Sequence, residues 1–488
     1  MKKAALTKSA KHFLADQNGS ATPLLIGFAI IFIVVGGLAV DYNKAVAERT
    51  QLQLATDTAA HTGLYTWTQT IADIDESRQT ALSMTFGMLP EVAYRDAMAT
   101  GDIEFGFWNP VTGTFTEDET FVEDKDDPRA SAVRAFAELE PERGNASRNI
   151  FLSIIGQDTF TVRASTIYAS YYPPCFNEGF VANGIVDMQS NSNYTDGFCI
   201  HSNTYVSLNQ NNFFEPGTVV SMPNLAELDI PSSGFEKNEG LQAALRQGRY
   251  RLRILNELPN MFASLRAGSS AFADVAGVAG PVDVLYPLDL PTNGNGGPTQ
   301  AQIDYAVSEL ANDNIAAYES LPTFEFDNGK KTLTPDSFPA ANRIYRIDCS
   351  GNGDITLSAG TFSSFALVTN CPVKTSNGTV LDEVLLATEG DVSASHLQIG
   401  LDDSCAPGGG ASIWTYGDFN AASGLQGFGA QMLALGDIDF AAQADGIEGV
   451  SFIADGEING TSENDMGFCG DGGGTDDFTK EPYFRMVN

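Results

Sequence analysis

The sequence predicts a membrane-anchored, mainly β protein. We expect an N-terminal transmembrane helix continuing into an amphipathic helix, a small α/β unit, and a mainly β C-terminal domain, a parallel β-solenoid with a helical insertion. Three observations support this order. Residues 24–40 are apolar and uncharged, the stretch after them has no Pro and no Gly before Gly63, and Gly-Asp turns separate short strand-like runs near the C-terminus.

Length and charge limit the class of protein. A chain of 488 residues has room for about two to four domains. Its 62 Asp and Glu outnumber 27 Lys and Arg, which gives a net charge of -35. Nucleic-acid binding requires a basic surface to neutralise phosphates, so we expect no nucleic-acid partner.

Residues 24–40 are the predicted membrane span. A helix of this length rises about 25 Å, which is just enough to cross a bilayer. Residues 1–23 form a tail, and by the positive-inside rule its lysines place it in the cytoplasm; these are Lys2, Lys3, Lys8 and Lys11. The alternative is a cleaved signal peptide, but the apolar core is long for one and lacks a clear cleavage site.

Residues 41–74 are predicted to form an amphipathic helix. Its apolar side chains recur at helical spacing and form one stripe: Leu52, Ala60, Leu64, Trp67 and Ile71. The stripe packs either against the chain's own globular part or against another subunit, and the sequence leaves both alternatives open.

A set of small and polar residues marks the N-terminal segment before, within and after the apolar run. They are Gly19, Gly36, Gly37, Asp41, Arg49, Leu52, Gln53, Ala55, Asp57, Ala59 and Ala60. With these residues the segment resembles the TadE/TadG-like proteins of the Flp (tight adherence) pilus assembly system, and is closest to the TadG-like members. The resemblance extends, less sharply, over residues 18–172. It implies a bacterial envelope protein whose N-terminal helix contacts other Tad components.

One departure from processed pilins affects the expected location. Those proteins have an acidic residue five positions into the mature helix, whereas no acid occurs here between Gly19 and Asp41. We therefore expect a retained, single-pass anchor in the bacterial inner membrane with a periplasmic C-terminal domain. The alternative is an extracellular, pilus-associated protein.

Residues 75–174 alternate apolar and polar residues in short runs and predict a small α/β domain. Six cysteines follow without metal-binding spacing, which indicates disulfides in an oxidising compartment. Six cysteines allow 15 connectivities. We favour the three neighbour pairs, Cys175 with Cys199, Cys349 with Cys371, and Cys405 with Cys469.

Residues 175–235 and 340–488 are expected to form the β-rich, solenoid-like domain. The first part contains many Asn residues between short strands, which is typical of stacked turns in β-solenoids. The second repeats Gly, an acid and an apolar residue, with 27, 19 and 20 residues between the last four copies, which begin at Gly390, Gly417, Gly436 and Gly456. An irregular β-sandwich is the alternative.

Residues 236–339 read as a helical insertion. A basic, Leu-rich segment over residues 236–268 has helical spacing, and a second helix is expected after Pro298. We interpret the block as an insertion in one solenoid, although two separate β domains would give the same pattern.

No catalytic motif is present, so we expect a protein that is not an enzyme and needs no cofactor. The chain has four histidines, and no nucleophile elbow, H-E-x-x-H or P-loop pattern. Acidic, Gly-rich loops are weak calcium candidates because Ca²⁺ prefers several oxygen ligands. The candidate ligands are Asp402, Asp403, Asp471, Asp476 and Asp477.

Three functions fit these observations. The first is a non-enzymatic, membrane-anchored component of Flp/Tad pilus assembly that presents a β-rich domain for envelope or adhesion interactions. The second is a surface adhesin or minor pilin that binds glycans with calcium. The third is a membrane-tethered carbohydrate-active enzyme on a β-helix.

Overall fold

The structure is a computed structural model. It describes residues 21–69, 73–122, 128–269, 271, 273, 276–288, 298–310, 312, 314–321, 330–349, 353–404, 406–461, 465–469 and 479–487. The chain divides into two compact units, residues 1–171 with 482–488, and residues 172–481. Each unit is described by itself.

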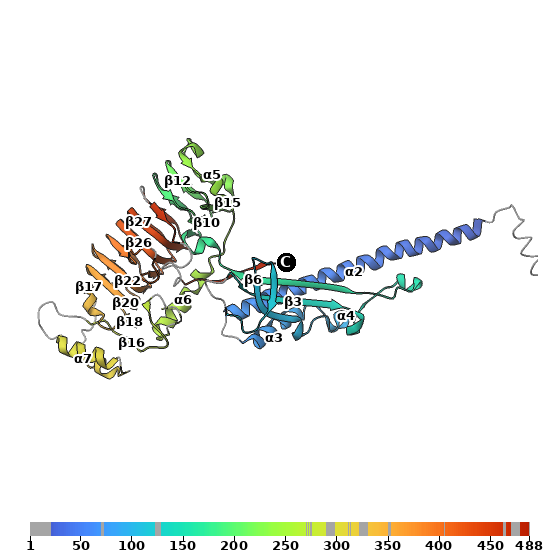
Figure 1. The fold of residues 1–488 in the computed structure, drawn as a ribbon, viewed down its shortest axis with the longest axis horizontal. Helices are drawn as coiled ribbons and strands as arrows, with labels where there is room; N and C mark the ends of the chain where they lie inside the picture. The colour runs from blue at the N-terminus through green and yellow to red at the C-terminus, as the bar shows by residue number, and fades with distance from the viewer. Residues whose placement is uncertain are drawn as a thin grey trace, which may run out of the picture. The chain divides into compact units, whose positions relative to one another are not determined.

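The first unit combines a long helix, α2, with a five-stranded antiparallel sheet (Figure 1). The strand order is β2-β1-β3-β6-β30, so the last strand of the chain lies at one edge. The elements are α2 (Ala21–Gln69), α3 (Ile74–Thr85), α4 (Glu91–Tyr94), β1 (Ile103–Asn109), β2 (Thr114–Glu117), β3 (Ala130–Leu139), β4 (Ser147–Arg148), a 3-10 helix η3 (Leu152–Ile155), β5 (Thr159–Phe160), β6 (Val162–Tyr171) and β30 (Tyr483–Met486).

The two halves of α2 have different surroundings. Its first half, which contains the apolar run, projects beyond the sheet with its side chains exposed (Figure 1). The second half packs on the sheet through small residues: Ala59 and Ala60 are fully buried, and Leu64 joins them in a cluster with Phe105 and Val133. Small side chains allow the helix to approach the sheet closely. The described part of the predicted stripe thus packs on the chain's own fold, whereas Ile71 lies outside the described residues.

The second unit contains a sheet of 23 strands that pair in parallel. In the C-terminal part, each long strand pairs in parallel with the next long strand along the chain. The strands are β7 (Gly179–Ala182), β8 (Val186–Met188), β9 (Asn193–Tyr194), β10 (Cys199–Ser202), β11 (Val206–Leu208), β12 (Asn212–Phe214), β13 (Val219–Met222), β14 (Asn238–Glu239), β15 (Leu245–Gln247), β16 (Val284–Leu285), β17 (Lys330–Leu333), β18 (Arg343–Ile347), β19 (Asp354–Leu357), β20 (Gly360–Thr369), β21 (Val373–Thr375), β22 (Thr379–Thr388), β23 (Val392–Ala394), β24 (Leu397–Ile399), β25 (Ala411–Thr415), β26 (Phe419–Ala434), β27 (Ile438–Ala454), β28 (Ile458–Gly460) and β29 (Asp465–Gly467).

The chain enters this sheet in the middle. Strands β7, β8 and β9 pair on one side with β10, β11 and β12, which follow them directly. On the other side they pair with β27, β28 and β29 from the C-terminal part. The chain therefore builds outward to β15, crosses to the opposite end at β16, and returns to close against its own first strands. We call this contact the closure.

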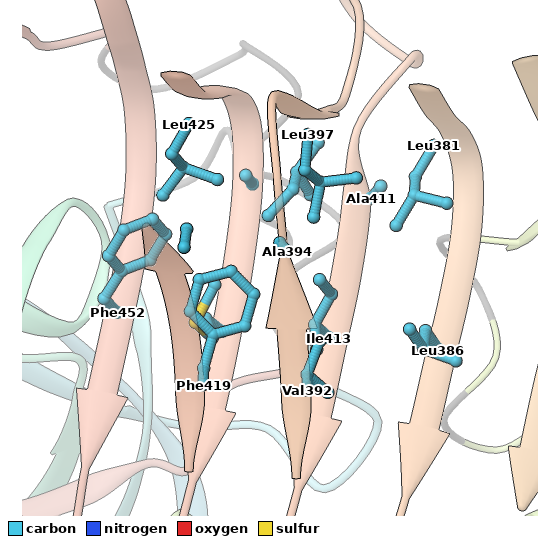
Figure 2. Close-up of a cluster of buried hydrophobic side chains, with 14 of the residues drawn as sticks. Leu381, Leu386, Val392, Ala394, Leu397, Ala411, Ile413, Phe419, Leu425 and Phe452 are labelled. Carbon is cyan, nitrogen blue, oxygen red and sulfur yellow. The ribbon is translucent and has the colours of Figure 1, made fainter. Parts of the chain in front are cut away.

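In many of these strands buried side chains alternate with outward ones, as period-2 patterning requires. Strands β7, β10 and β25 are instead buried at every position. In strand β21, Val373 and Thr375 are buried on either side of Lys374, and the same pattern recurs in β23 and β28. Figure 2 shows inward side chains of successive strands in contact, among them Leu386, Ile413 and Phe419.

The repeated Gly-Asp turns stack on one another. The backbone N–H of Asp418 donates to Asp391 Oδ1 (3.1 Å), that of Asp437 to Asp418 Oδ1 (2.9 Å), and that of Glu457 to Asp437 Oδ1 (2.7 Å). We call these three bonds the aspartate ladder. A Cβ at Gly436 would overlap the Asp418 carboxylate, so the turn needs glycine before the acid.

Asparagine side chains connect neighbouring turns around β7 to β12. The Asn-rich sequence of this part predicts such stacked turns. Asn203 Nδ2 donates to Asn183 Oδ1 (2.6 Å), and Asn183 Nδ2 donates to Asp455 Oδ1 (2.5 Å). The second bond spans the closure. Asn212 Oδ1 accepts from the backbone of Ser192 at 2.9 Å in the same way.

Between described residues, two disulfides brace this unit, and both are among the favoured neighbour pairs. Cys175 is bonded to Cys199, with Cα atoms 4.9 Å apart, and Cys349 is bonded to Cys371, with Cα atoms 5.2 Å apart. The third favoured pair includes Cys405, which lies outside the described residues.

The segment expected to be a helical insertion contains both helices and strands. Its helices are α5 (Leu241–Ala244), α6 (Arg253–Arg266), α7 (Gln300–Leu310) and α8 (Ala316–Glu319). The helix expected over residues 236–268 forms only in the second half of that segment, as α6. The first half contains β14 and β15, which pair with β12 and β13. α7 follows Pro298 as expected. The β parts before and after the block belong to one sheet.

Candidate functional site

The first candidate site is the junction between α2 and the 147–160 segment of the first unit. Asp41, at the end of the apolar run, is 1 % exposed. Its carboxylate accepts three backbone N–H groups, from Ile150 (2.9 Å), Phe151 (3.0 Å) and Leu152 (2.8 Å). A carboxylate that accepts several N–H groups makes strong, charge-assisted bonds. Asp41 therefore fixes this loop to the helix.

Residues on either side of Asp41 extend the junction. A Cβ at Gly37, one turn earlier, would overlap Phe151, so glycine is needed for the loop to reach the helix. Lys44 Nζ, one turn later, donates to the backbone oxygen of Arg148 at 2.7 Å. The loop thus contacts about two turns of α2.

A polar cluster joins the middle of α2 to strand β6. Gln53 Nε2 donates to Thr166 Oγ1 (2.7 Å) and to Asp57 Oδ1 (2.8 Å), and Thr166 Oγ1 donates to Asp57 Oδ1 (2.6 Å). Thr56 contacts the same threonine hydroxyl at 2.8 Å. Four side chains share one set of hydrogen bonds, which sets the register of the helix on the sheet.

The motif residues of α2 divide into two groups. Arg49 is the one that is exposed. The others described by the structure face the protein: Asp41, Leu52, Gln53, Ala55, Asp57, Ala59 and Ala60. Gly19 lies outside the described residues. Most of the described motif residues therefore serve the contact of α2 with its own unit, whereas Arg49 faces solvent.

The second candidate site is a column of outward polar side chains on the parallel sheet. The strand registers place these residues on one face of adjacent strands: Thr356, Lys374, Ser393, Asn420, Asp439, Asn459, Asp187 and Ser207. We call this the outward column. Neighbouring members lie one strand spacing apart, about 4.8 Å, and Asn459 Nδ2 donates to Asp439 Oδ1 at 2.7 Å.

A shallow cavity of about 270 Å³ lies along the middle of the outward column. Its polar lining includes Asp187, Asn420, Asp439 and Asn459. Burial raises the pKa of Asp187, and the nearby Asp229 carboxylate raises it further. A hydrogen bond from the Ser207 hydroxyl partly offsets this by lowering the pKa. Carboxylates and amides at this spacing can accept and donate hydrogen bonds to a ligand with several hydroxyl groups.

His201 is buried in strand β10, which pairs with β7 beside the closure. Its Nδ1 lies 2.7 Å from Ser221 Oγ and its Nε2 lies 3.0 Å from Asn203 Oδ1, and its ring packs edge-on against Tyr250. Burial lowers the pKa of His201 to about 4, although the Asn203 bond opposes this shift. The imidazole is therefore neutral at pH 7 and serves as a packed hydrogen-bonding group.

Two family models match the chain, one in each of its two compact units. Residues 179–282 and 292–470, more than half of the chain, match the family model described as Domain of unknown function (DUF7867). The chain belongs to the DUF7867 family. In this member, residues 19–64 match the Flp pilus-assembly TadE/G-like (Tad) model, which agrees with the resemblance seen in the sequence. No curated protein and no solved structure matches the chain.

The two matches coincide with the two candidate sites. The DUF7867 match covers the outward column, and the Tad match covers the half of the junction that α2 contributes. By length and composition α2 is able to cross a membrane, and it is the one helix among the described residues that is. The apolar part of α2 is almost entirely exposed. Together with the Tad match, this indicates a membrane anchor and a pilus-associated protein.

The calcium candidates are not brought together among the residues that the structure describes. Asp402 and Asp403 are exposed, and Asp403 Oδ1 accepts the backbone N–H of Ala406 at 3.0 Å. Asp471, Asp476 and Asp477 lie outside the described residues. Within the described part of the chain, no group of three or more His, Cys, Asp or Glu residues could hold a metal ion.

Sequence reasoning missed the two most specific contacts of these sites. It identified Asp41 from the motif but not its partners, which lie more than 100 residues later in a loop without a recognisable pattern. It also missed the outward column, although the alternation of single polar residues within apolar strands was a usable signal. Predicting which strands lie side by side required the registers.

Proposed function

We propose that this DUF7867 member is a TadG-like, non-enzymatic component of Flp/Tad pilus assembly. In this proposal α2 is retained in the inner membrane with the N-terminus in the cytoplasm, and the remainder is periplasmic. The parallel sheet forms a β-solenoid that presents a binding surface for envelope or adhesion interactions. The observation that carries the proposal is the junction, where a Tad-type motif joins an apolar helix to a folded unit.

Arg49 is the proposed contact to other Tad components. It is the exposed member of a motif whose other described members are used internally. Exposed apolar residues of α2 lie on the same helical face as Arg49, among them Tyr42 (61 %) and Val46 (44 %). A partner helix could pack on this apolar surface and place an acidic side chain near Arg49.

The test is complementation in a host whose Flp pili depend on Tad proteins. Arg49→Glu should abolish piliation and co-purification of Tad partners while the chain accumulates at its normal level. Arg95→Glu, an exposed residue of the same unit, is the matched control and should retain both. Normal piliation without the chain would contradict the proposal. Recovery in sheared surface material, cut near Gly19, would favour the minor-pilin alternative.

A second candidate function is glycan adhesion, and the outward column favours it. The cavity on the column is lined by carboxylates and amides without a Lys or Arg, which suits a neutral, hydroxyl-rich ligand. In a glycan array with the full chain, Asn459→Ala should reduce binding, whereas Ser393→Ala, in the same column but outside the cavity lining, should not. Equal binding by both variants would exclude this role of the cavity.

A further inference from the structure

The loop that Asp41 holds has an apolar, exposed tip. Its four large side chains are Ile150 (62 % exposed), Phe151 (37 %), Ile154 (69 %) and Ile155 (59 %). Clustered apolar exposure of this kind marks a contact with another apolar surface. We call these four residues the apolar tip.

The apolar tip lies beside the membrane span and is fixed there. Phe151 occupies the space beside Gly37, and three N–H groups of the loop bind Asp41. Gly37 precedes the last apolar residue, Val40, by three residues, or about 4.5 Å of helix rise. The tip is therefore level with the last turn of the span.

Six backbone N–H groups in and beside the tip have partners within the protein. Beyond the three N–H groups bound by Asp41, Ile154 N–H donates to Phe151 O (3.1 Å), Gly156 N–H to Ser153 O (3.1 Å), and Gln157 N–H to Leu152 O (3.1 Å). An unsatisfied backbone group is costly in an apolar medium, so such pairing is what an inserted loop requires.

Polar and basic groups lie on the other side of the tip, toward the sheet. Lys44 donates to Arg148 O, and Arg148 itself is exposed. Lys44 is four residues beyond Val40, so these groups lie about 6 Å past the end of the span. Basic side chains at this level face lipid headgroups, and apolar side chains one to two turns deeper face the acyl boundary.

We propose that the apolar tip inserts into the leaflet that the C-terminal end of the membrane span crosses, and that its ligand is the acyl–glycerol region of the lipids. The continuity of the tip with the span selects lipid as the occupant. The junction then has two membrane contacts, α2 and the tip, which fix the tilt and rotation of the antiparallel sheet relative to the bilayer. This inference goes beyond the proposed pilus role and rests only on its membrane-anchor part, that α2 lies in a bilayer.

The test uses the full chain in nanodiscs of ordinary or brominated phosphatidylcholine. Bromine on the acyl chains quenches a tryptophan only at close range, so Ile154→Trp should lose emission in the brominated discs. Val111→Trp is the control, because Val111 is 80 % exposed in the β1–β2 turn, at the end of the sheet farthest from the span. The wild-type chain provides the background from Trp67, Trp108 and Trp414.

Three outcomes separate the possible occupants. Quenching of I154W well above V111W supports insertion, and Ile155→Trp should repeat it if I154W folds poorly. Quenching of I154W no greater than V111W, with free access to an aqueous quencher, overturns the proposal and leaves the tip in water. Protection from both quenchers also overturns it and assigns the tip to a protein contact, such as a second copy.

Discussion

The antiparallel unit and the parallel unit differ in how often each stabilising contact occurs. In the antiparallel unit, Asp41 binds one loop and Asp57 joins one polar cluster, and neither contact recurs among the residues described there. In the parallel unit, the same turn bond recurs along the aspartate ladder. The closure is the exception, because it joins strands far apart in the sequence. Single substitutions should therefore have large effects at unique contacts and small effects within the ladder.

The largest effect is expected at the closure. Phe180 in β7 packs against Phe198 of the following turn and against Phe440 and Phe452 of the C-terminal part, with ring centroids 5.1, 5.4 and 5.5 Å apart. Phe180→Ala should lower the free energy of unfolding of the parallel unit by about 3–5 kcal/mol. Chemical denaturation measures this.

Phe213→Ala is the matched control for that measurement. Phe213 lies in β12, one turn from the closure, and is 38 % exposed. Its removal should cost much less because most of the lost surface already faces water. Equal losses of unfolding free energy for the two variants would mean that the buried closure contact stabilises the unit no more than an exposed side chain does.

The second prediction concerns pH and tests a unique contact within the parallel unit. His201 has a folded pKa of about 4 and an ordinary value of 6.5, so the unfolded chain binds the proton first as pH falls. Stability is full above about pH 6.5 and decreases toward pH 4, by about 3 kcal/mol in total. His201→Gln should remove this part of the pH dependence while carboxylate effects remain. An unchanged slope between pH 6.5 and 4 would contradict the assignment.

The third prediction is local to the junction. Asp41→Asn removes the charge and replaces one acceptor oxygen with an amide that cannot accept. Amide hydrogen exchange at Ile150, Phe151 and Leu152 should accelerate by about tenfold or more, since the charge-assisted bonds weaken. Exchange in β3 should stay the same, which distinguishes local release of the loop from unfolding of the sheet. Unchanged exchange in the loop would show that its own packing holds it.

The smallest effect is expected within the aspartate ladder. Asp418→Ala removes one exposed bond to the N–H of Asp437 while the strands above and below remain paired. We expect a loss of about 1 kcal/mol or less by denaturant unfolding. Gly436→Val, at the neighbouring position, should cost more because its side chain would displace the Asp418 carboxylate. A large loss for Asp418→Ala would mean that the turns do not act as equivalent repeats.

Repeated and unique contacts also differ in how far the sequence predicts them. The Gly-Asp repeat predicted stacked turns because the glycine is required wherever the carboxylate of the previous turn occupies the space of a Cβ. Two of the three favoured neighbour cysteine pairs are disulfides in the structure. Helix α2 was predictable over most of its length from the apolar run and the motif.

The unpredicted contacts join distant segments that share no pattern. Nothing in residues 179–194 indicates that residues 438–467 will lie beside them, because any strand with alternating residues could pair there. The pairing of β30 with β6 was missed for the same reason. At the junction, the sequence identified Asp41 on the helix, while the loop that satisfies its carboxylate was visible only in the structure.

The closure also determines when the chain can finish folding during synthesis. Strands β7–β9 are made early, yet one of their two neighbours is made about 270 residues later, as the Asn183–Asp455 bond illustrates. Until then the exposed edge can pair with other chains, and such long-range pairing is slow. The antiparallel sheet is completed even later, because its edge strand β30 is synthesised after every other strand. A chain that stopped before Ile458 would leave an open edge in both sheets, so premature termination should produce aggregation-prone fragments of both units.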